Sequence, residues 1–217
     1  MKIQDKQSIL FTGDSITDCG RARPVGMGGG LGSGYVALVD SLLAACHPER
    51  GILVLNTGIS GNRVTDLETR WQTDVLDLKP DWLSVMIGVN DVWRHFDNHL
   101  NADQVGLKRY ESTYRRILEQ TRGHVSGLVL MTPFFLEPNR ADPMRAQLDA
   151  YGEVVERLAN EFDAVFVNVQ AAFDAYLTHR PTQSLCGDRV HPNQTGHLVI
   201  AKTFLTAMAF EWTREAI

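Results

Sequence analysis

The sequence has little of what disulfide-bonded, membrane-spanning or nucleic-acid-binding proteins need. Its three cysteines are an odd number without Cys-x-x-Cys spacing, which predicts free thiols rather than a disulfide framework or a zinc site. No apolar run approaches the roughly 18 residues of a membrane span. No basic run is present to neutralise phosphates, and the formal charge at pH 7 is −5. We therefore expect neither a membrane nor nucleic acid as a partner.

The start of the chain also lacks the pattern of a signal peptide. Residues 1–7 are polar and lead directly into the first apolar segment. Together with the free thiols, this predicts a cytoplasmic protein. The sequence leaves the oligomeric state open, and a homo-oligomer is compatible with it.

Motifs for cofactors and metals are missing as well. The glycine-rich stretch 26–34 has no lysine where a phosphate-binding loop needs one, and its glycines do not complete a dinucleotide-binding pattern. We expect an ordered surface loop there, without an assigned role. His95 and His99 stand four apart but lack the glutamate of a zinc-protease helix. The sequence thus predicts no metal and no cofactor.

What the chain does have is the alternation of an α/β protein. Its 217 residues, 44% of them hydrophobic, suit one domain over residues 1–217 with a sizeable core. Between the apolar runs, apolar residues recur every three or four positions, as in helices that cover a sheet. Nearly continuous apolar runs, typical of buried parallel strands, occur at 8–12, 52–56, 82–87, 127–131 and 164–169. The sequence predicts a three-layer α/β/α sandwich with five parallel strands.

Two short segments at opposite ends of the chain supply the parts for acyl transfer. Residues 13–17 read Gly-Asp-Ser-Ile-Thr and follow the first predicted strand; residues 188–192 read Asp-Arg-Val-His-Pro. Ser15 would be the nucleophile, His191 its general base, and Asp188 the group that orients the imidazole. Two structural alternatives remain open: Ser15 as a helix N-cap, and Asp188 with His191 as a cap of the last helix.

These segments resemble the first and last motifs of the SGNH hydrolases, also called GDSL esterases. The two motifs expected between them are present in the same order, Gly-Ile-Ser-Gly-Asn at 58–62 and Gly-Val-Asn-Asp at 88–91. The resemblance covers nearly the whole chain and implies a flavodoxin-like strand order. It also implies catalysis by Ser15, Asp188 and His191.

The resemblance further implies an oxyanion hole built from the Ser15 backbone N–H, Gly61 and Asn90. Glycine lets a backbone amide approach the substrate closely, and an asparagine side chain is a neutral donor. All three residues follow predicted strands, at the edge of the sheet where ligands bind in such folds. As alternatives, Gly61 would be a turn residue and Asn90 a helix cap.

Substrate preference is harder to predict, because the family motifs are shared by enzymes that cleave lysophospholipids, thioesters, aryl esters and sugar acetates. Further stretches, among them 17–24, 91–94 and 142–145, are similar to intracellular bacterial acetylxylan esterases. This similarity implies removal of acetyl groups from small xylo-oligosaccharides, with Trp93 and Arg94 next to the oxyanion hole as candidate substrate contacts. Trp93 is equally compatible with core packing.

Two functions from other classes are alternatives to a serine esterase. One is a phosphotransfer protein with Asp14 as the acceptor, but Ile16 stands where a second acidic residue is usual. The other is a non-catalytic flavin-binding module on the same fold. Neither explains the spacing of Asp188 and His191.

Overall fold

The computed structural model describes residues 1–97 and 104–212. β1 lies inside its sheet, paired with β3 and β4, and the β1 residues Ile9, Leu10 and Phe11 are completely buried. Five parallel strands lie in the order β3-β1-β4-β5-β6, and β2 pairs antiparallel to β3 at one edge. The strands are β1 (Ser8–Gly13), β2 (Gly26–Met27), β3 (Leu53–Asn56), β4 (Trp82–Met86), β5 (Gly127–Met131) and β6 (Val165–Val167).

The sequence predictions of an α/β sandwich and of five parallel strands are confirmed. The order of the parallel strands is the flavodoxin-like one, in which the second strand lies outside the first. The short strand β2 was not predicted. It lies in the glycine-rich stretch, where two residues pair with β3 before the chain turns into a single 3₁₀ turn, Gly28–Gly30.

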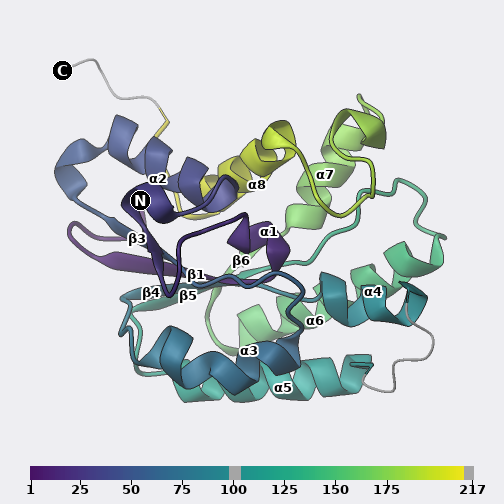
Figure 1. The fold of residues 1–217 in the computed structure, drawn as a ribbon, viewed down its shortest axis with the longest axis horizontal. Helices are drawn as coiled ribbons and strands as arrows, with labels where there is room; N and C mark the ends of the chain where they lie inside the picture. The colour runs from purple at the N-terminus through teal and green to yellow at the C-terminus, as the bar shows by residue number, and fades with distance from the viewer. Residues whose placement is uncertain (98–103, 213–217) are drawn as a thin grey trace.

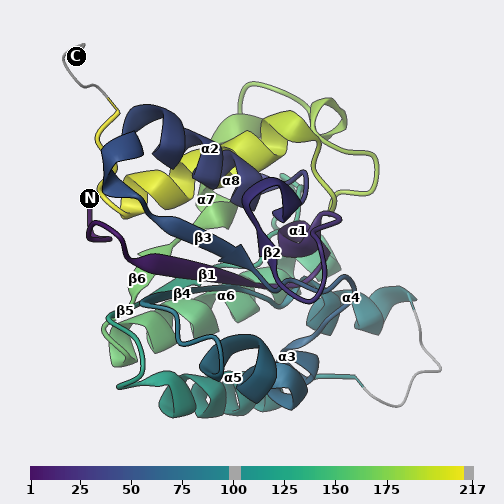
Figure 2. The same ribbon diagram turned by 60° about the vertical axis from the view of Figure 1, so that its left-hand side comes forward.

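Helices cover both faces of the sheet, as Figures 1 and 2 show. α2 packs against α8 and α8 against α7 on one face, while α3 packs against α5 and α6 against α5 and α4 on the other. The helices are α1 (Ser15–Asp18), α2 (Tyr35–Cys46), α3 (Val64–Trp71), α4 (Val89–Asp97), α5 (Leu107–Thr121), α6 (Pro143–Glu161), α7 (Val169–Leu177) and α8 (Gln194–Ala207). A π-helical segment, η3 (Gln72–Leu76), continues α3.

Aromatic side chains join the layers. The ring of Phe11 on β1 lies 5.7 Å from that of Tyr35 on α2 and 4.9 Å from that of Phe204 on α8. On the opposite face, the indole of Trp71 donates a 3.0 Å hydrogen bond to the Thr121 hydroxyl and thereby connects α3 to α5. Tyr35, Trp71 and Phe204 thus lie on the core faces of their helices.

This topology brings three loops together at the carboxyl edge of the sheet. β1 leads into α1, which begins at Ser15, and β4 leads into α4, which contains Asn90. β1 and β4 are neighbours at the point where the strand order reverses, which is where open α/β sheets form a crevice. β3, on the other side of β1, leads into the loop that carries Gly61. Among the helices in the described part of the chain, none is both long and apolar enough to span a membrane.

Candidate active site

Segments from near the two ends of the chain come together at Ser15. Its Oγ lies 3.0 Å from Nε2 of His191, and Nδ1 of His191 lies 2.6 Å from Oδ2 of Asp188. A carboxylate can only accept, so Nδ1 carries the proton and Nε2 is left to accept from the serine hydroxyl. The side chains of His191 and Asp188 are 46% and 44% exposed, so the arrangement is open to solvent and to a substrate.

The loop that carries Asp188 is folded around its own carboxylate. Oδ1 of Asp188 accepts hydrogen bonds from the backbone amides of Val190 (3.0 Å) and His191 (2.8 Å). Arg189, which directly follows Asp188, has a φ of +66°, and its carbonyl accepts from the Leu136 amide. Partial burial raises the pKa of Asp188, but the hydrogen bonds from His191 outweigh it and hold that pKa below its usual value. Asp188 is therefore ionised at neutral pH.

Asp14, which directly precedes Ser15, is turned away from the reacting hydroxyl. Its Oδ1 accepts a 3.0 Å hydrogen bond from the Ile16 amide and caps α1. Burial raises the pKa of Asp14 from 3.8 to about 7, against the opposing effects of that hydrogen bond and of His191. A carboxyl group that is partly protonated at neutral pH repels a nearby negative charge less than an ionised one. Its role at this position is to start the helix.

The three expected oxyanion donors lie on the loops after β1, β3 and β4. Ser15 is the first residue of α1, where backbone N–H groups have no partner inside the helix. Gly61 has a φ of +82°, a conformation that glycine adopts without strain, and it is exposed. Asn90 is buried, with 3% of its surface exposed, and its Nδ2 donates a 3.1 Å hydrogen bond to the Asn62 carbonyl. This bond uses one amide hydrogen and leaves the other available.

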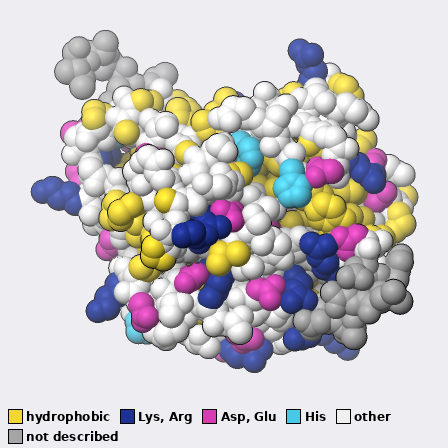
Figure 3. Space-filling model, viewed as in Figure 1, with side chains coloured by type: hydrophobic (Ala, Val, Ile, Leu, Met, Phe, Trp, Pro, Cys, Tyr) yellow, Lys and Arg dark blue, Asp and Glu magenta, His cyan; other side chains and the backbone are white. Residues whose placement is uncertain are grey.

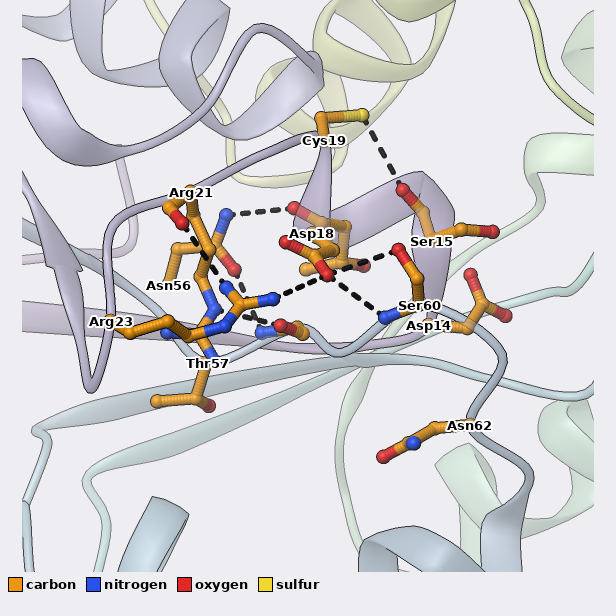
Figure 4. Close-up of polar contacts among 12 residues, drawn as sticks. Asp14, Ser15, Asp18, Cys19, Arg21, Arg23, Asn56, Thr57, Ser60 and Asn62 are labelled. Carbon is orange, nitrogen blue, oxygen red and sulfur yellow. Dashed lines mark hydrogen bonds and ion pairs between the residues drawn. The ribbon is translucent and has the colours of Figure 1, made fainter.

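The loop that carries Gly61 is fastened to α1. The carboxylate of Asp18 accepts from the Ser60 amide at 2.9 Å and its hydroxyl at 3.0 Å, and it pairs with Arg23 at 2.7 Å (Figure 4). Gly58 lies so close to α1 that a Cβ there would come within 2.5 Å of the Asp18 amide nitrogen. The nucleophile helix and the loop are thus packed backbone against backbone.

Of the two candidate substrate contacts, Trp93 borders a cavity beside His191 and Arg94 does not. The Trp93 ring lies 5.9 Å from that of His191 and borders a cavity of about 240 Å³. Arg94 is not among the residues that border this cavity; it pairs with Asp97 and its guanidinium lies over the Trp93 ring. The cavity is lined by Trp93, Phe96, Asp97, Phe135, Asp142, Pro143, Met144, Asp188 and Arg189. In Figure 3 hydrophobic side chains gather beside a histidine, flanked by acidic and basic side chains.

Sequence reasoning missed Asn62 and Arg70, which hold the loop after β3. Oδ1 of Asn62 accepts from Nε of Arg70 at 2.8 Å. Nothing in the sequence marks Arg70, because an arginine in an amphipathic helix ordinarily faces solvent. Only the fold shows that its guanidinium reaches the carboxyl edge of the sheet.

The predictions about cysteines and metals are tested to different extents. Cys19, Cys46 and Cys186 are free thiols, as expected. No group of three or more potential metal ligands occurs among the described residues, and His99 lies outside them. The expectation of a metal-free, cofactor-free site stays a prediction.

The comparisons with known proteins agree with this geometry. Residues 11–199 match the family profile of the GDSL-like lipase/acylhydrolase family. The chain belongs to this family, and the resemblance found in the sequence is confirmed.

An acetylxylan esterase from Geobacillus stearothermophilus is 51% identical over 217 residues, which cover 99% of each chain. The crystal structure of Axe2, an acetylxylan esterase from the same organism, superposes with a TM-score of 0.98 over 100% of both chains, at 51% identity. LAE5, an alpha/beta hydrolase enzyme from the metagenome of Lake Arreo, is 46% identical with a TM-score of 0.94 and covers 96% of this chain and 98% of its own. Axe2 variants described as catalytic mutants replace its serine 15, one aspartate, or the histidine that follows that aspartate by three positions.

Proposed function

We propose that this protein is a serine esterase that removes acetyl groups from small acetylated xylo-oligosaccharides through an acyl-enzyme on Ser15. The observation that carries the proposal is the continuous hydrogen-bonded row from Ser15 through His191 to Asp188. The catalytic mutants of Axe2 replace a serine at position 15, or an aspartate and a histidine that are three positions apart, as Asp188 and His191 are in this chain.

In the first half-reaction, Ser15 Oγ attacks the carbonyl carbon of the acetyl ester while Nε2 of His191 takes its proton. Asp188 keeps the other ring nitrogen protonated and stabilises the imidazolium that forms. Negative charge develops on the carbonyl oxygen, where the amides of Ser15 and Gly61 and the side chain of Asn90 donate to it. The C–O bond to the sugar then breaks, and His191 returns the proton to the departing alkoxide.

In the second half-reaction, water replaces the sugar. Nε2 of His191 takes a proton from the water, whose oxygen attacks the acetyl carbon bound to Ser15. The tetrahedral intermediate is held by the same three donors and collapses to acetate, and Ser15 recovers its proton from His191. Water can reach the acyl-enzyme because His191 is 46% exposed.

The cavity beside Asp188 supports a sugar as the alcohol part of the substrate. Its volume of about 240 Å³ offers aromatic and aliphatic walls together with carboxylates and one guanidinium. Apolar faces and hydroxyl-binding groups in one site match a sugar ring, which has both C–H faces and a polar rim. A lysophospholipase, thioesterase or arylesterase of the same family is the alternative. The acidic residues Asp97 and Asp142 oppose a phosphate-bearing alcohol.

The experiment is a comparison of substrates. Acetylated xylo-oligosaccharides are assayed beside p-nitrophenyl acetate, butyrate and octanoate. We expect a steep fall in rate from acetate to octanoate, because each methylene that a small pocket cannot hold costs about 1–3 kcal/mol. We also expect inactivation by a serine-directed organophosphorus reagent and no effect of a chelator. Faster cleavage of octanoyl than of acetyl esters would move the enzyme to the lipase or thioesterase group.

We further propose a cytoplasmic location, where imported oligosaccharides and not intact xylan would be the substrate. A small-molecule ester is the expected partner, with neither a membrane nor nucleic acid involved. Whether the protein forms a homo-oligomer is a separate question, which its mass in solution answers.

A further inference from the structure

The guanidinium of Arg70, on α3, donates hydrogen bonds to three segments of the site. The Arg70 side chain is 14% exposed. Its Nε donates to Oδ1 of Asn62 at 2.8 Å, its Nη1 to the Thr57 carbonyl at 2.7 Å, and its Nη2 to the Gly13 carbonyl at 3.1 Å. Asp74, on η3, accepts from Nη1 at 2.7 Å and orients the group.

These acceptors belong to the segments that carry the oxyanion donors. Gly13 ends β1, two residues before Ser15; Thr57 follows the end of β3; and Asn62 directly follows Gly61. The Gly13 carbonyl also accepts from the Ile59 amide at 3.0 Å, so the loop after β3 and Arg70 converge on one oxygen. A planar fork with several fixed donors can hold such acceptors at set separations, which a single ammonium cannot.

The contacts extend from Arg70 to the third donor. Asn62 accepts from Arg70 through its side chain and from Nδ2 of Asn90 through its backbone carbonyl, at 3.1 Å. The direction of the free Asn90 N–H therefore depends on where the Asn62 carbonyl lies, and Arg70 helps to fix that position.

We propose that Arg70 is a positioning residue that sets the geometry of the oxyanion hole, holding the Ser15 turn against the Gly61 loop and orienting Asn90 through Asn62. This inference rests on the proposed function, because it assumes that these three donors stabilise the oxyanion. If Arg70 served only as the i,i+4 partner of Asp74, its replacement would change stability slightly and leave turnover unchanged.

The first test is Arg70→Lys, which keeps the charge and removes the fork. On p-nitrophenyl acetate we expect kcat to fall about 10- to 100-fold, the scale of loss from a small misplacement of reacting groups, with KM changing by less than about threefold. The acid limb of the pH–rate profile stays where it is, because Ser15, His191 and Asp188 keep their hydrogen bonds. Arg116→Lys is the matched control, since Arg116, on α5, also pairs with a carboxylate, Glu68 of α3, but is 53% exposed.

The second test is a double-mutant cycle with Asn90→Ala, which alone should lower kcat by about 10²–10³. With Asn90 already gone, Arg70→Lys should cost less than it does in the wild-type background. Fully multiplicative losses, a wild-type kcat in folded Arg70→Lys, or a shifted acid limb would each overturn the role proposed for Arg70.

The outcomes separate this inference from the proposed function. If Asn90→Ala leaves kcat unchanged, the oxyanion hole itself is wrongly assigned. If Asn90→Ala behaves as expected and Arg70→Lys does not, only the role of Arg70 is wrong. Should Arg70→Lys fail to fold, Asn62→Ala tests the same contacts, because it removes the Oδ1 acceptor and keeps the backbone carbonyl. An unchanged kcat in that variant would contradict the inference.

Discussion

At the scale of single residues, two hydrogen bonds decide the chemistry. Asp188 accepts from Nδ1 of His191, which leaves Nε2 as the acceptor for the Ser15 hydroxyl. A neutral serine is a weak nucleophile, so the reaction depends on His191 being unprotonated when the substrate is bound. Asp188 fixes the ring in the tautomer with Nδ1 protonated, because its own pKa is lowered and it stays ionised well below neutral pH.

The first prediction concerns pH. Turnover should fall on the acid side, because a protonated imidazole cannot accept the proton of Ser15. Asp14 is a second group that could produce an acid limb, because burial raises its pKa to about 7. The variant Asp14→Asn keeps the cap of α1 and removes this titration. We expect the acid limb of the kcat profile to persist in Asp14→Asn.

The measurement is the pH–rate profile of both proteins on p-nitrophenyl acetate. Loss of the acid limb in folded Asp14→Asn would show that Asp14 causes it, and would contradict the prediction. A thermal unfolding curve for each protein reports whether the substitution has disturbed the fold.

At the scale of the elements, the site depends on close packing of α1 against the loop after β3. A Cβ at Gly58 would come within 2.5 Å of the Asp18 amide nitrogen and 2.8 Å of the Thr17 carbonyl carbon. Because both neighbours are backbone, neither can move alone. Gly58→Ala should therefore destabilise the fold by about 1–3 kcal/mol and lower kcat, since α1 begins at Ser15.

Gly29→Ala is the control for this prediction. A Cβ at Gly29 would meet nothing within 4 Å. Urea unfolding and esterase assays on both variants give the comparison. Equal stability and equal turnover in the two alanine variants would contradict the close packing described here.

Another element-scale prediction concerns the buried carboxylate that joins α3 to α4. Asp91 accepts from the Val64 amide at the start of α3, and burial raises its pKa to about 8. The folded state then holds a proton that the unfolded state releases above about pH 4, so the contribution of Asp91 to stability falls as pH rises from about 4 to about 8. Asp91→Asn keeps an acceptor for Val64 and cannot ionise.

We therefore expect Asp91→Asn to match the wild type near pH 4 and to exceed it in stability by up to about 5 kcal/mol at pH 8, since each unit of pKa difference between the folded and unfolded states corresponds to about 1.4 kcal/mol. Chemical denaturation at the two pH values tests this, and the comparison between proteins cancels other titrating groups. A stability difference that is the same at both values would mean that Asp91 ionises normally.

At the scale of the whole molecule, strands and core faces could be predicted because they depend on local pattern. The run around Leu10 is apolar throughout because both faces of β1 are covered, and the stripe through Trp71 repeats with the period of a helix. β2 escaped prediction because it is only two residues long and gains its pairing from β3. Short strands depend on a neighbour that the local sequence does not contain.

In the candidate site, too, some residues could be predicted from local sequence and others depend on distant neighbours. Ser15, Gly61, Asn90, Asp188 and His191 could be proposed from motif and spacing, and the structure brings Ser15, His191 and Asp188 into contact. The positions of Asn62 and Arg70 could not be predicted, because their contacts join residues from β1, the loop after β3 and α4 that are distant in sequence. Such supporting contacts follow from the topology and not from any motif.

The central claim concerns the whole chain, since it requires a fold that places Ser15 against a histidine 176 positions away. Its most direct test is release of acetate from acetylated xylo-oligosaccharides by wild-type protein and by Ser15→Ala, with unfolding curves for both. We predict that Ser15→Ala folds as the wild type does and loses about 10⁴-fold or more in kcat, because the hydroxyl that would carry the acetyl group is gone. A folded Ser15→Ala that keeps a tenth of the wild-type rate would contradict the account.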